Sequence, residues 1–505
     1  MVNCRISASN CLKTHEKLSM PFEERNIGSL IADLAISDPD APCVEQDGIC
    51  HSRAEVINSA AVLVDFFKGH RVTAGASVAI VAVDRLRALE AMIALWSLDA
   101  AVLLLDPRQP IGEIQTVKEK VGLDSVFTDS KSFARRGGFD LIPARDSTMK
   151  CAMGLHFSSG SQHCDALILS SSGTTGFPRF RRVTHQAFLE GLWASGQLLN
   201  NQIPLSAVSV GSLAFGAVLS HWIKLLINGK FLLSLPLIFG VQELHQALTR
   251  SDIQSVGLPP VLITDLLEFH KENTAAQDGP AYPHITRMAS LGGPISPDKL
   301  VQAYRMLTPG VKNMYSMSGV GAVSILSGDE VLEKPNSVGK PFSEVTIRIE
   351  DETSGLCPIG QIGRIVAKPN WKDGAAPIDT GDYGWIDEDG YLFIQGRSEQ
   401  TACRNSINVN LLDLEFDVKR IMGVRDCIAF AVQADGSPDD MIFLAVETKI
   451  DLDRAKKQMK SSLASYRRPD RIMICSHLPR NSSNKIALRT VKNMAIEEET
   501  QFVDF

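Results

Sequence analysis

Apolar and polar residues alternate along most of the chain between short β-like runs and helical patterns. Residues 77–83 form an apolar run rich in β-branched side chains, and residues 101–105 form another. Between them, residues 85–98 carry apolar side chains at helical spacing. This order predicts a strand, a helix and a second strand, which is a βαβ unit.

Three further segments show the same change from a strand pattern to a helix pattern. The expected strands and helices cover residues 167–170 and 186–199, 255–258 and 261–270, and 287–291 and 297–307. Helices that alternate with buried strands predict parallel sheets covered by helices. The most apolar stretch, residues 213–241, is interrupted by charged and polar residues, so we predict a buried helix followed by a strand and no membrane span.

The pattern changes after residue 343 to short strands separated by glycine-containing turns, which predicts a small β subdomain. Its expected strands cover residues 345–350, 364–368 and 391–395. Beyond residue 397 we expect a compact α+β domain. Its expected helices cover residues 411–422 and 452–464 with one more at the end, and its strands cover 427–432, 441–447 and 471–475.

The predicted fold class is therefore α/β. We expect a large N-terminal domain, residues 1–396, of mostly parallel sheets flanked by helices plus the small β subdomain. A small mobile α+β domain, residues 397–505, follows it. A length of 505 residues agrees with more than one domain, because one hydrophobic core seldom organises so long a chain.

Composition and charge narrow the classes of function. Hydrophobic residues make up 44% of the chain and charged residues 22%, as in a globular protein. The net charge of -7 argues against nucleic acid as a partner, because a phosphate backbone requires a dominant basic face. The ten cysteines include no C-x-x-C pair, and the N-terminus lacks the apolar segment of a secretory signal. We therefore expect a cytoplasmic protein.

A loop of small and hydroxyl-bearing residues, 171–176, follows the expected strand at 167–170. Gly173 and Gly176 permit backbone geometries that turn successive N–H groups toward one anion, and the serine and threonine hydroxyls add donors. The ATPase phosphate loop would need a lysine after the last glycine, but Phe177 stands there. From composition alone, a phosphate loop and a plain surface loop are equally good interpretations.

Residues 171–179 resemble S-S-G-T-T-G-x-P-K, the phosphate loop of the adenylate-forming enzymes. This superfamily includes acyl- and aryl-CoA synthetases, peptide-synthetase adenylation domains and firefly luciferase, and the loop is most similar to that of the acyl-CoA synthetases. The family's other motifs follow in its order and cover nearly the whole chain. Residues 291–294 resemble its G-G-A segment, 313–318 resemble N-x-Y-G-x-T, 380–382 match T-G-D, 396–399 resemble the G-R-x-D/K hinge, and 479–486 resemble P-R-T-x-x-G-K-I.

The resemblance implies a role for each matching residue. The ring of Tyr315 would stack on adenine, the carboxylate of Asp382 would accept ribose hydroxyls, and Glu399 would be the hinge. Lys485 and Ser318 are the expected catalytic residues. The expected nucleotide-binding residues are Ser171, Ser172, Gly173, Thr174, Thr175, Gly176, Arg179, Gly292, Gly293, Pro294, Asn313, Tyr315, Ser316, Met317, Asp382 and Arg397.

The activity implied is that of an ATP-dependent carboxylic acid–thiol ligase. The acid would attack the α-phosphorus of ATP and form an acyl-adenylate and pyrophosphate, with Lys485 stabilising the developing charge. The C-terminal domain would then turn about Glu399, so that a thiol can attack the activated carbonyl. The implied cofactors are ATP, Mg²⁺ and CoA, or the phosphopantetheine of a carrier protein in place of CoA. The oligomeric state is left open, with a homodimer as one option.

The expected acyl pocket lies between the helix that begins near Phe215 and the segment 292–294. Its expected lining is apolar and consists of Phe215, Val218, Leu219, Trp222 and Met317. This lining favours an apolar acid and leaves the choice between aryl and aliphatic acids open.

The chain departs from the family pattern at several positions. Arg179 replaces the loop lysine, and Asn484 replaces the glycine before Lys485. Gly319 stands where the family has a glutamate that helps to hold Mg²⁺, so the metal ligands stay unassigned. Ser406 and Asn408 replace a glycine and a basic residue of the thiol tunnel. Two alternatives therefore accompany the CoA ligase: an enzyme that loads a carrier protein, and a catalytically weakened nucleotide-binding relative.

Overall fold

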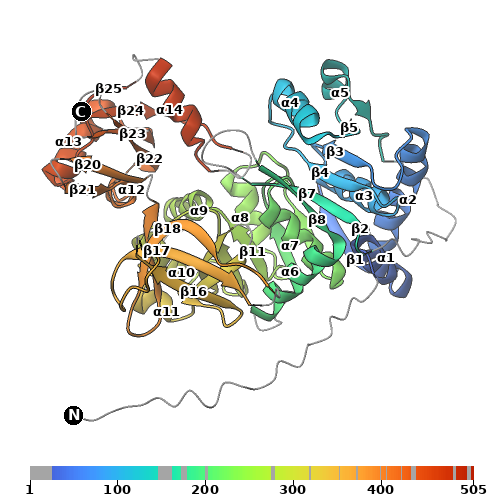
Figure 1. Cartoon of the computed structure of the whole chain (residues 1–505), viewed down its shortest axis with the longest axis horizontal. Helices are drawn as coiled ribbons and strands as arrows, with labels where there is room; N and C mark the ends of the chain where they lie inside the picture. The colour runs from blue at the N-terminus through green and yellow to red at the C-terminus, as the bar shows by residue number, and fades with distance from the viewer. Residues whose placement is uncertain are drawn as a thin grey trace, which may run out of the picture.

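The structure, a computed structural model, contains two large sheets, a small β subdomain and a C-terminal unit (Figure 1). It describes residues 25–145, 162–171, 179–198, 203–273, 279–317, 320–351, 353–370, 374–397, 400–404, 407–421, 423–433, 440–481, 485–497 and 502–505.

The first sheet has six strands in the order β6-β5-β3-β4-β7-β8. Its strands are β3 (Ser77–Val81), β4 (Ala101–Leu104), β5 (Ser125–Thr128), β6 (Asp140–Leu141), β7 (Asp165–Ser171) and β8 (Arg179–Thr184). All neighbours are parallel except β7 and β8, which are antiparallel. The βαβ unit is confirmed, with α3 (Arg85–Trp96) between β3 and β4. Strand β8, before the predicted helix α6 (His185–Leu198), was not predicted.

The second sheet has nine strands in the order β15-β14-β13-β12-β11-β9-β10-β1-β2. Its strands are β1 (Pro42–Gln46), β2 (Ile49–Ser52), β9 (Ser206–Ser209), β10 (Phe231–Ser234), β11 (Ser255–Leu258), β12 (Arg287–Ser290), β13 (Val311–Met317), β14 (Gly321–Ser327) and β15 (Lys340–Pro341). The strands from β13 to β1 run parallel, and antiparallel strands form both edges.

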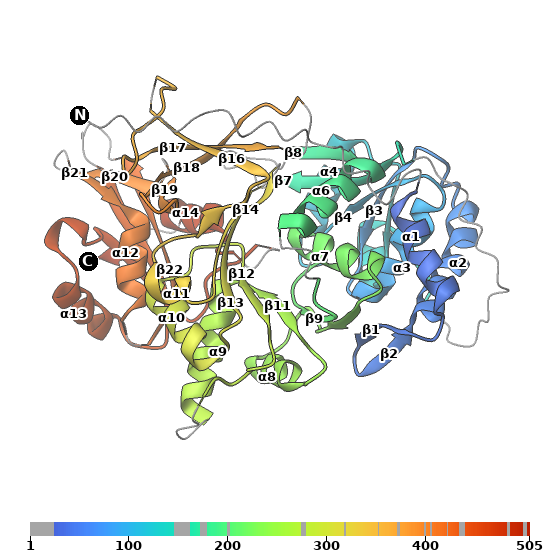
Figure 2. The ribbon, with the colours of Figure 1, turned by 90° about the horizontal axis from the view of Figure 1, so that it is seen from below.

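Helices cover both faces of the second sheet. Residues Ala207 and Leu232 pack in one buried cluster with α7 (Gly216–Ile227), whereas their neighbours Val208 and Leu233 pack in another with α8 (Val241–Thr249), α9 (Pro260–Asn273) and α10 (Pro297–Met306). Helices α6 and α7 lie between the two large sheets (Figure 2). The predicted helix and strand within residues 213–241 are confirmed as α7 and β10.

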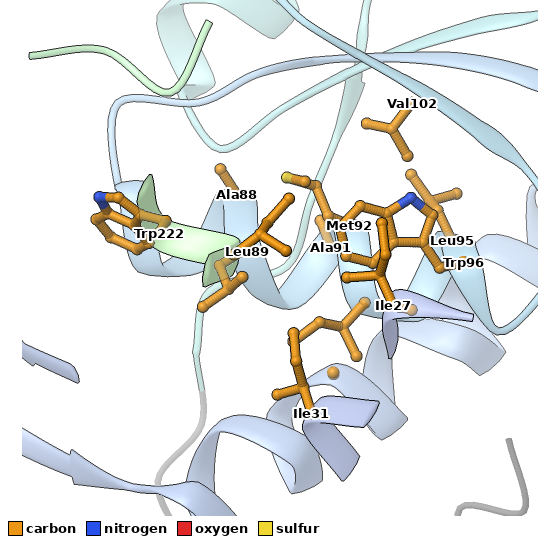
Figure 3. Packing of buried hydrophobic residues seen from close by; sticks show 14 of the residues in the cluster. Ile27, Ile31, Ala88, Leu89, Ala91, Met92, Leu95, Trp96, Val102 and Trp222 are labelled. Carbon is orange, nitrogen blue, oxygen red and sulfur yellow. The ribbon is translucent and has the colours of Figure 1, made fainter. Parts of the chain in front are cut away.

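Every residue of helix α3 is buried, because the helix packs against other elements on every face. It belongs to the same buried cluster as Ala207, Leu232 and α7. Its Trp96 and Met92 lie against Ile27 of α1 (Ile27–Ser37), as Figure 3 shows. The indole nitrogen of Trp96 donates to the carbonyl of Ala166 at 2.8 Å, which ties the helix to the first sheet. The remaining N-terminal helices are α2 (Arg53–Gly69), α4 (Ile111–Val121) and α5 (Lys131–Gly137).

The β subdomain is an antiparallel sheet in the order β16-β17-β18-β19. Its strands are β16 (Val345–Glu350), β17 (Gly363–Pro369), β18 (Ile378–Ile386) and β19 (Leu392–Arg397), and the short helix α11 (Glu330–Glu333) precedes it. Strand β18 was not predicted, because its centre carries the T-G-D motif, which has the composition of a turn.

The C-terminal unit consists of a hairpin and a four-stranded sheet in the order β22-β23-β24-β25. Its elements are β20 (Thr401–Arg404), β21 (Ile407–Asn410), α12 (Leu411–Lys419), β22 (Val424–Gln433), β23 (Asp440–Thr448), α13 (Leu452–Ser462), the 3₁₀ turn Ser465–Arg467, β24 (Arg471–Cys475), α14 (Leu488–Glu497) and β25 (Val503–Asp504). Two buried clusters contain residues of this unit alone. The predicted α/β fold class is confirmed, while the boundary at residue 396 stays a prediction.

Among the described helices, none combines the length and the apolar character that crossing a bilayer requires.

Candidate active site

The phosphate-loop motif lies at the open end of an antiparallel hairpin. Strands β7 and β8 pair in a register that places Ser171 opposite Arg179 and Ser170 opposite Phe180. The pairing brings both ends of the motif to one edge of the first sheet. The motif residues between these strands, Ser172, Gly173, Thr174, Thr175 and Gly176, lie outside the described residues.

Tyr315 and Asp382 come from different sheets and meet directly. The Tyr315 hydroxyl donates a hydrogen bond of 2.5 Å to Oδ2 of Asp382, although 67 residues separate them in the chain. Only 8% of Asp382 is exposed. The contact sets the tyrosine ring and the carboxylate side by side, as an adenine platform and a ribose acceptor need to be.

Asp382 lies within β18, where the sequence predicted a loop. Gly381 keeps the turn-like character, since its φ is +75° and its N–H donates to Oδ1 of Asp379 at 2.8 Å. The backbone N–H of Asp382 donates to Oγ1 of Thr380 at 3.0 Å. Strand β18 continues on both sides of this irregularity and pairs Asp382 with Arg397 of β19. Two predicted ligand residues are thus directly opposite each other in the sheet.

Lys485 lies against the predicted adenine and acyl segment. A Cβ built on Gly292, whose φ is +84°, would lie 3.4 Å from Cε of Lys485. The glycine therefore leaves room for the lysine side chain from the C-terminal unit. Gly292 comes two residues after the buried end of β12, so the lysine lies at the carboxyl edge of the second sheet, where ligands of α/β folds bind.

The loop that carries Lys485 is held by hydrogen bonds at both ends. The N–H of Lys485 donates to Oδ1 of Asn481 at 3.0 Å, and the N–H of Asn481 donates to the carbonyl of Lys485 at 2.8 Å. An isolated bridge joins Arg480 to Ile486. The Arg480 guanidinium donates to the buried Glu447 and to Asp426, each at 2.8 Å.

An ion pair joins the C-terminal unit to the second sheet's helices. Arg425 of β22 donates to both carboxylate oxygens of Asp265 on α9, at 2.9 and 2.7 Å. It also donates to Oε1 of Glu447 at 2.6 Å, and its hydrogen bonds to Asp265 raise the pKa of Arg425. Glu447 therefore links the Asp265–Arg425 pair to Arg480 and the lysine loop. No sequence motif indicated this link, because its members are widely separated along the chain.

The remaining residues of segments 292–294 and 313–317 lie just after β12 and along β13. Gly293 and Pro294 are exposed after β12, and the Asn313 side chain donates to the carbonyl of Ser337 at 3.2 Å. Ser316 and Met317 end β13, with Ser316 exposed and Met317 half-buried.

Three of the predicted acyl-pocket residues on α7 pack in or against one buried cluster. Phe215 caps the helix and is half-buried, and the half-buried Val218 packs against the cluster around α3. Leu219 and Trp222 belong to that cluster, and Figure 3 shows Trp222 beside Ala88 and Leu89. The Trp222 indole donates to Oγ of Ser209 at 2.6 Å. These two side chains join the sheets, and the pocket assignment stays a prediction.

The predicted metal site has no ligands assigned. Within the described part of the chain, no group of three or more histidines, cysteines, aspartates or glutamates could hold a metal ion. Ser318, Gly319 and the hinge residue Glu399 lie outside that part, as do Ser406 and Asn484.

Comparison with known proteins decides the family. The model of the AMP-binding enzyme family matches residues 35–371. The chain therefore belongs to the AMP-binding enzyme family. This confirms the predicted superfamily. Tyr315 lies within the matched residues, and the roles of Tyr315, Asp382 and Lys485 stay predictions.

The AMP-binding chain has curated relatives among bacterial CoA ligases. It is 25% identical to the 2-succinylbenzoate–CoA ligase of Oceanobacillus iheyensis over 346 residues, which cover 63% of this chain and 68% of the relative. The enzyme of the same name from Enterococcus faecalis is 24% identical over 424 residues, which cover 78% of this chain and 84% of the relative.

Solved structures share the fold of this AMP-binding chain. O-succinylbenzoate coenzyme A synthetase of Bacillus subtilis, in complex with ATP and magnesium ion, superposes with a TM-score of 0.74 at 20% identity, covering 92% of this chain and 99% of that one. The McyG A-PCP structure with phenylalanyl-adenylate gives a TM-score of 0.77 at 16% identity, covering 94% and 83%.

Replacing Asp382 by alanine is expected to weaken ATP binding and leave the protein folded. The substitution removes the carboxylate that Tyr315 contacts and buries no new charge. The loss of a charge-assisted hydrogen bond is worth about 1.5–3 kcal/mol, or roughly 10- to 100-fold in affinity. Titration calorimetry with ATP measures this, and Asp389→Ala on the exposed turn before β19 is the control. Unchanged affinity together with a large fall in melting temperature would assign Asp382 a structural role.

Proposed function

We propose that this chain is an ATP-dependent carboxylic acid–CoA ligase that forms an acyl-adenylate and then a thioester. The observation that carries the proposal is the contact of Lys485 with the Gly292 segment, at the sheet edge. The Tyr315–Asp382 pair supplies the nucleotide side of the same proposal. AMP-forming acid–thiol ligase, the predicted class of enzyme, is also the class of the curated relatives.

In the first half-reaction the chain would bind and orient ATP and the acid. The ring of Tyr315 would hold adenine, and Asp382 would accept the ribose hydroxyls. The Lys485 ammonium would approach the α-phosphate past Gly292, where the lack of a Cβ leaves space. The acid carboxylate attacks the α-phosphorus, the bond to the β-phosphate oxygen breaks, and pyrophosphate leaves. Preorganised charge of this kind is the main source of catalysis in phosphoryl transfer.

Magnesium accompanies ATP in this proposal and neutralises charge on the phosphates. The residues that match the family's nucleotide-binding motifs fit ATP. An aromatic ring, a nearly buried carboxylate and a cation lie near one another at one edge of the sheet. We also propose Ser318 as a catalytic residue beside Lys485, and this assignment rests on the N-x-Y-G-x-T motif alone.

In the second half-reaction residues 397–505 would move as a domain about Glu399, as the family motif implies. The thiol then loses its proton to solvent and its sulfur attacks the carbonyl carbon. The bond from that carbon to the oxygen shared with phosphorus breaks, and AMP leaves with its electron pair. Free CoA is the proposed acceptor, because the curated relatives are named CoA ligases. A carrier-protein phosphopantetheine remains the alternative acceptor, supported by the structural likeness to an A-PCP protein.

A pyrophosphate-release assay tests the proposal directly. The purified protein is incubated with ATP, Mg²⁺ and a panel of carboxylic acids, with and without CoA, and the nucleotide products are separated. We expect AMP and pyrophosphate in a 1:1 ratio with the preferred acid, and a thioester when CoA is present. The substrate of the curated relatives, 2-succinylbenzoate, is the first acid to test. Formation of ADP and orthophosphate, or no turnover with any acid, would contradict the proposal.

A further inference from the structure

Four basic side chains gather between α7 and the second sheet. His221 and Lys224 lie one turn apart on α7. Arg287 is the first residue of β12, and Lys312 is the second residue of the neighbouring strand β13. Each of the four is partly buried. We refer to them as the basic cluster.

The sheet register places both strand residues on the face that α7 covers. Met288 and Val311 point into the cluster with α8, α9 and α10, so the adjacent Arg287 and Lys312 point to the opposite face. That is also the face of Ala207, which packs with α7. Arg287 and Lys312 therefore lie on the face that α7 covers, and Arg287 is close enough to His221 and Lys224 for its charge to lower the pKa of both.

The positive charge of Arg287 acts on each of the other three groups. Burial, followed by this charge, lowers the pKa of Lys224 to about 8. Burial and then Arg287 also lower the pKa of Lys312. Burial, followed by Lys224 and Arg287, lowers the pKa of His221 to about 4. Like charges in a partly buried site repel each other, so a bound anion would stabilise them.

His221 adds an observation that points to a ligand. Its Nε2 is buried and has no hydrogen-bond partner among the described residues. A buried polar atom without a partner costs free energy comparable to a lost hydrogen bond. The neutral imidazole can satisfy it by donating Nε2–H to an oxygen.

The basic cluster lies below the candidate active site, along the predicted acyl pocket. Arg287 precedes Gly292 by five residues, about 16 Å of extended chain, and Lys312 precedes Tyr315 by three, about 10 Å. Helix α7 starts at the carboxyl edge near Phe215 and runs toward the cluster. On this face of the sheet Gly257 and Ala289, which pair with each other, lie between the two levels together with Met314, and the Leu291 side chain lies over Gly257.

We infer that the basic cluster binds a second anionic group of the acid substrate, at the end of the acyl pocket far from the reacting carboxylate. This inference rests on the proposed function and specifies its substrate class: a dicarboxylic acid, or an acid with another anion at the distal end. It replaces the apolar acid favoured by the sequence. Lys224, Arg287 and Lys312 supply charge, and His221 supplies a hydrogen bond.

A matched pair of acids tests the inference on the unmodified enzyme. 2-Succinylbenzoate and 4-oxo-4-phenylbutanoate differ only in the carboxylate on the ring. Straight-chain dicarboxylic acids, each compared with the monocarboxylic acid of equal length, extend the series. We expect kcat/KM for adenylate formation to be ~10- to 100-fold higher for the preferred diacid than for its monoacid partner, the range expected for one charged hydrogen bond.

Two charge-removing variants assign the preference to the basic cluster. Lys224→Met and Lys312→Met should each lower kcat/KM for the diacid at least tenfold and leave the value for the monoacid within about twofold. Lys271→Met, on α9 at the opposite face of the sheet, is the matched control and should change neither. Melting temperature and ATP affinity confirm that the variants are folded.

The outcomes separate the inference from the proposed function. Turnover of monoacids as efficient as that of their diacid partners would overturn the inference and leave the ligase activity standing. A diacid preference that both variants retain would also overturn it, since the anion would then bind elsewhere. If no acid of either kind releases pyrophosphate, the proposed function itself fails. The comparison on the unmodified enzyme decides the matter even if a variant does not fold.

Discussion

Replacing Lys485 by alanine is expected to slow adenylate formation by ~10²–10³, the usual cost of removing one preorganised group that stabilises developing charge. The lysine reaches the Gly292 segment from a loop fixed by Asn481 and Arg480. In the proposed adenylation step its ammonium would lie where charge develops on the α-phosphate. No described residue of the neighbouring segment 292–294 carries a cation that could replace it.

The two half-reactions distinguish this role from a structural one. Adenylate formation is measured by pyrophosphate exchange, and thioester formation by supplying a chemically prepared acyl-adenylate with CoA. The second rate should stay close to that of the unmodified enzyme, because in the proposed mechanism Lys485 would leave the site when the domain turns. Lys457→Ala, an exposed lysine on α13, is the control for lost charge in the same unit. Equal losses in both halves would contradict the assignment.

Replacing Glu447 by alanine is expected to destabilise the C-terminal unit by about 3 kcal/mol, near the lower end for breaking a buried ion pair. Glu447 is 1% exposed and accepts from Arg425, from Arg480 and from the N–H of Leu478. The expected loss of stability is near the lower end of that range because each arginine keeps a second carboxylate partner. Arg425 keeps Asp265, and Arg480 keeps Asp426.

Urea unfolding followed by circular dichroism measures this loss, and pyrophosphate exchange on the folded fraction measures its consequence for Lys485. We expect adenylate formation to fall as well, because Glu447 holds the arginine that anchors the lysine loop. Arg420→Ala is the control: its pair with Asp298 is exposed on both sides and should contribute less than about 1 kcal/mol. A Glu447 variant as stable as the control would show that the two arginines are satisfied without it.

Local patterns were sufficient to predict most of the fold. The apolar spacing in α3 and the strand runs on either side of it are set by neighbours within a few residues, so the βαβ unit was predicted closely. The same holds for α10 and for β22 to β24. Strand β18 was missed because a glycine with positive φ and hydrogen-bonding side chains at its centre have the composition of a turn.

The candidate site was predicted from motifs, and its supporting contacts were not. Motif order indicated Tyr315, Asp382 and Lys485, but the pairing of Asp265 with Arg425 joins positions 160 residues apart and leaves no periodic signal. Trp222 was expected in the acyl pocket because it is apolar and near Phe215. Its direction depends on how α7 packs against α3, which the sequence of α7 alone does not determine.

Different residues of α7 contribute to the stability of the fold and to the proposed choice of substrate. Leu219 and Trp222 hold the helix between the sheets, and their replacement would affect folding whatever the substrate. His221 and Lys224 are partly buried but do not belong to that cluster, so an exchange of charge for an apolar group there would keep the Leu219 and Trp222 side chains in place. If the basic cluster binds the second anion, a lineage could pass from diacids to monoacids through a few substitutions on one helix, without a compensating change in the scaffold.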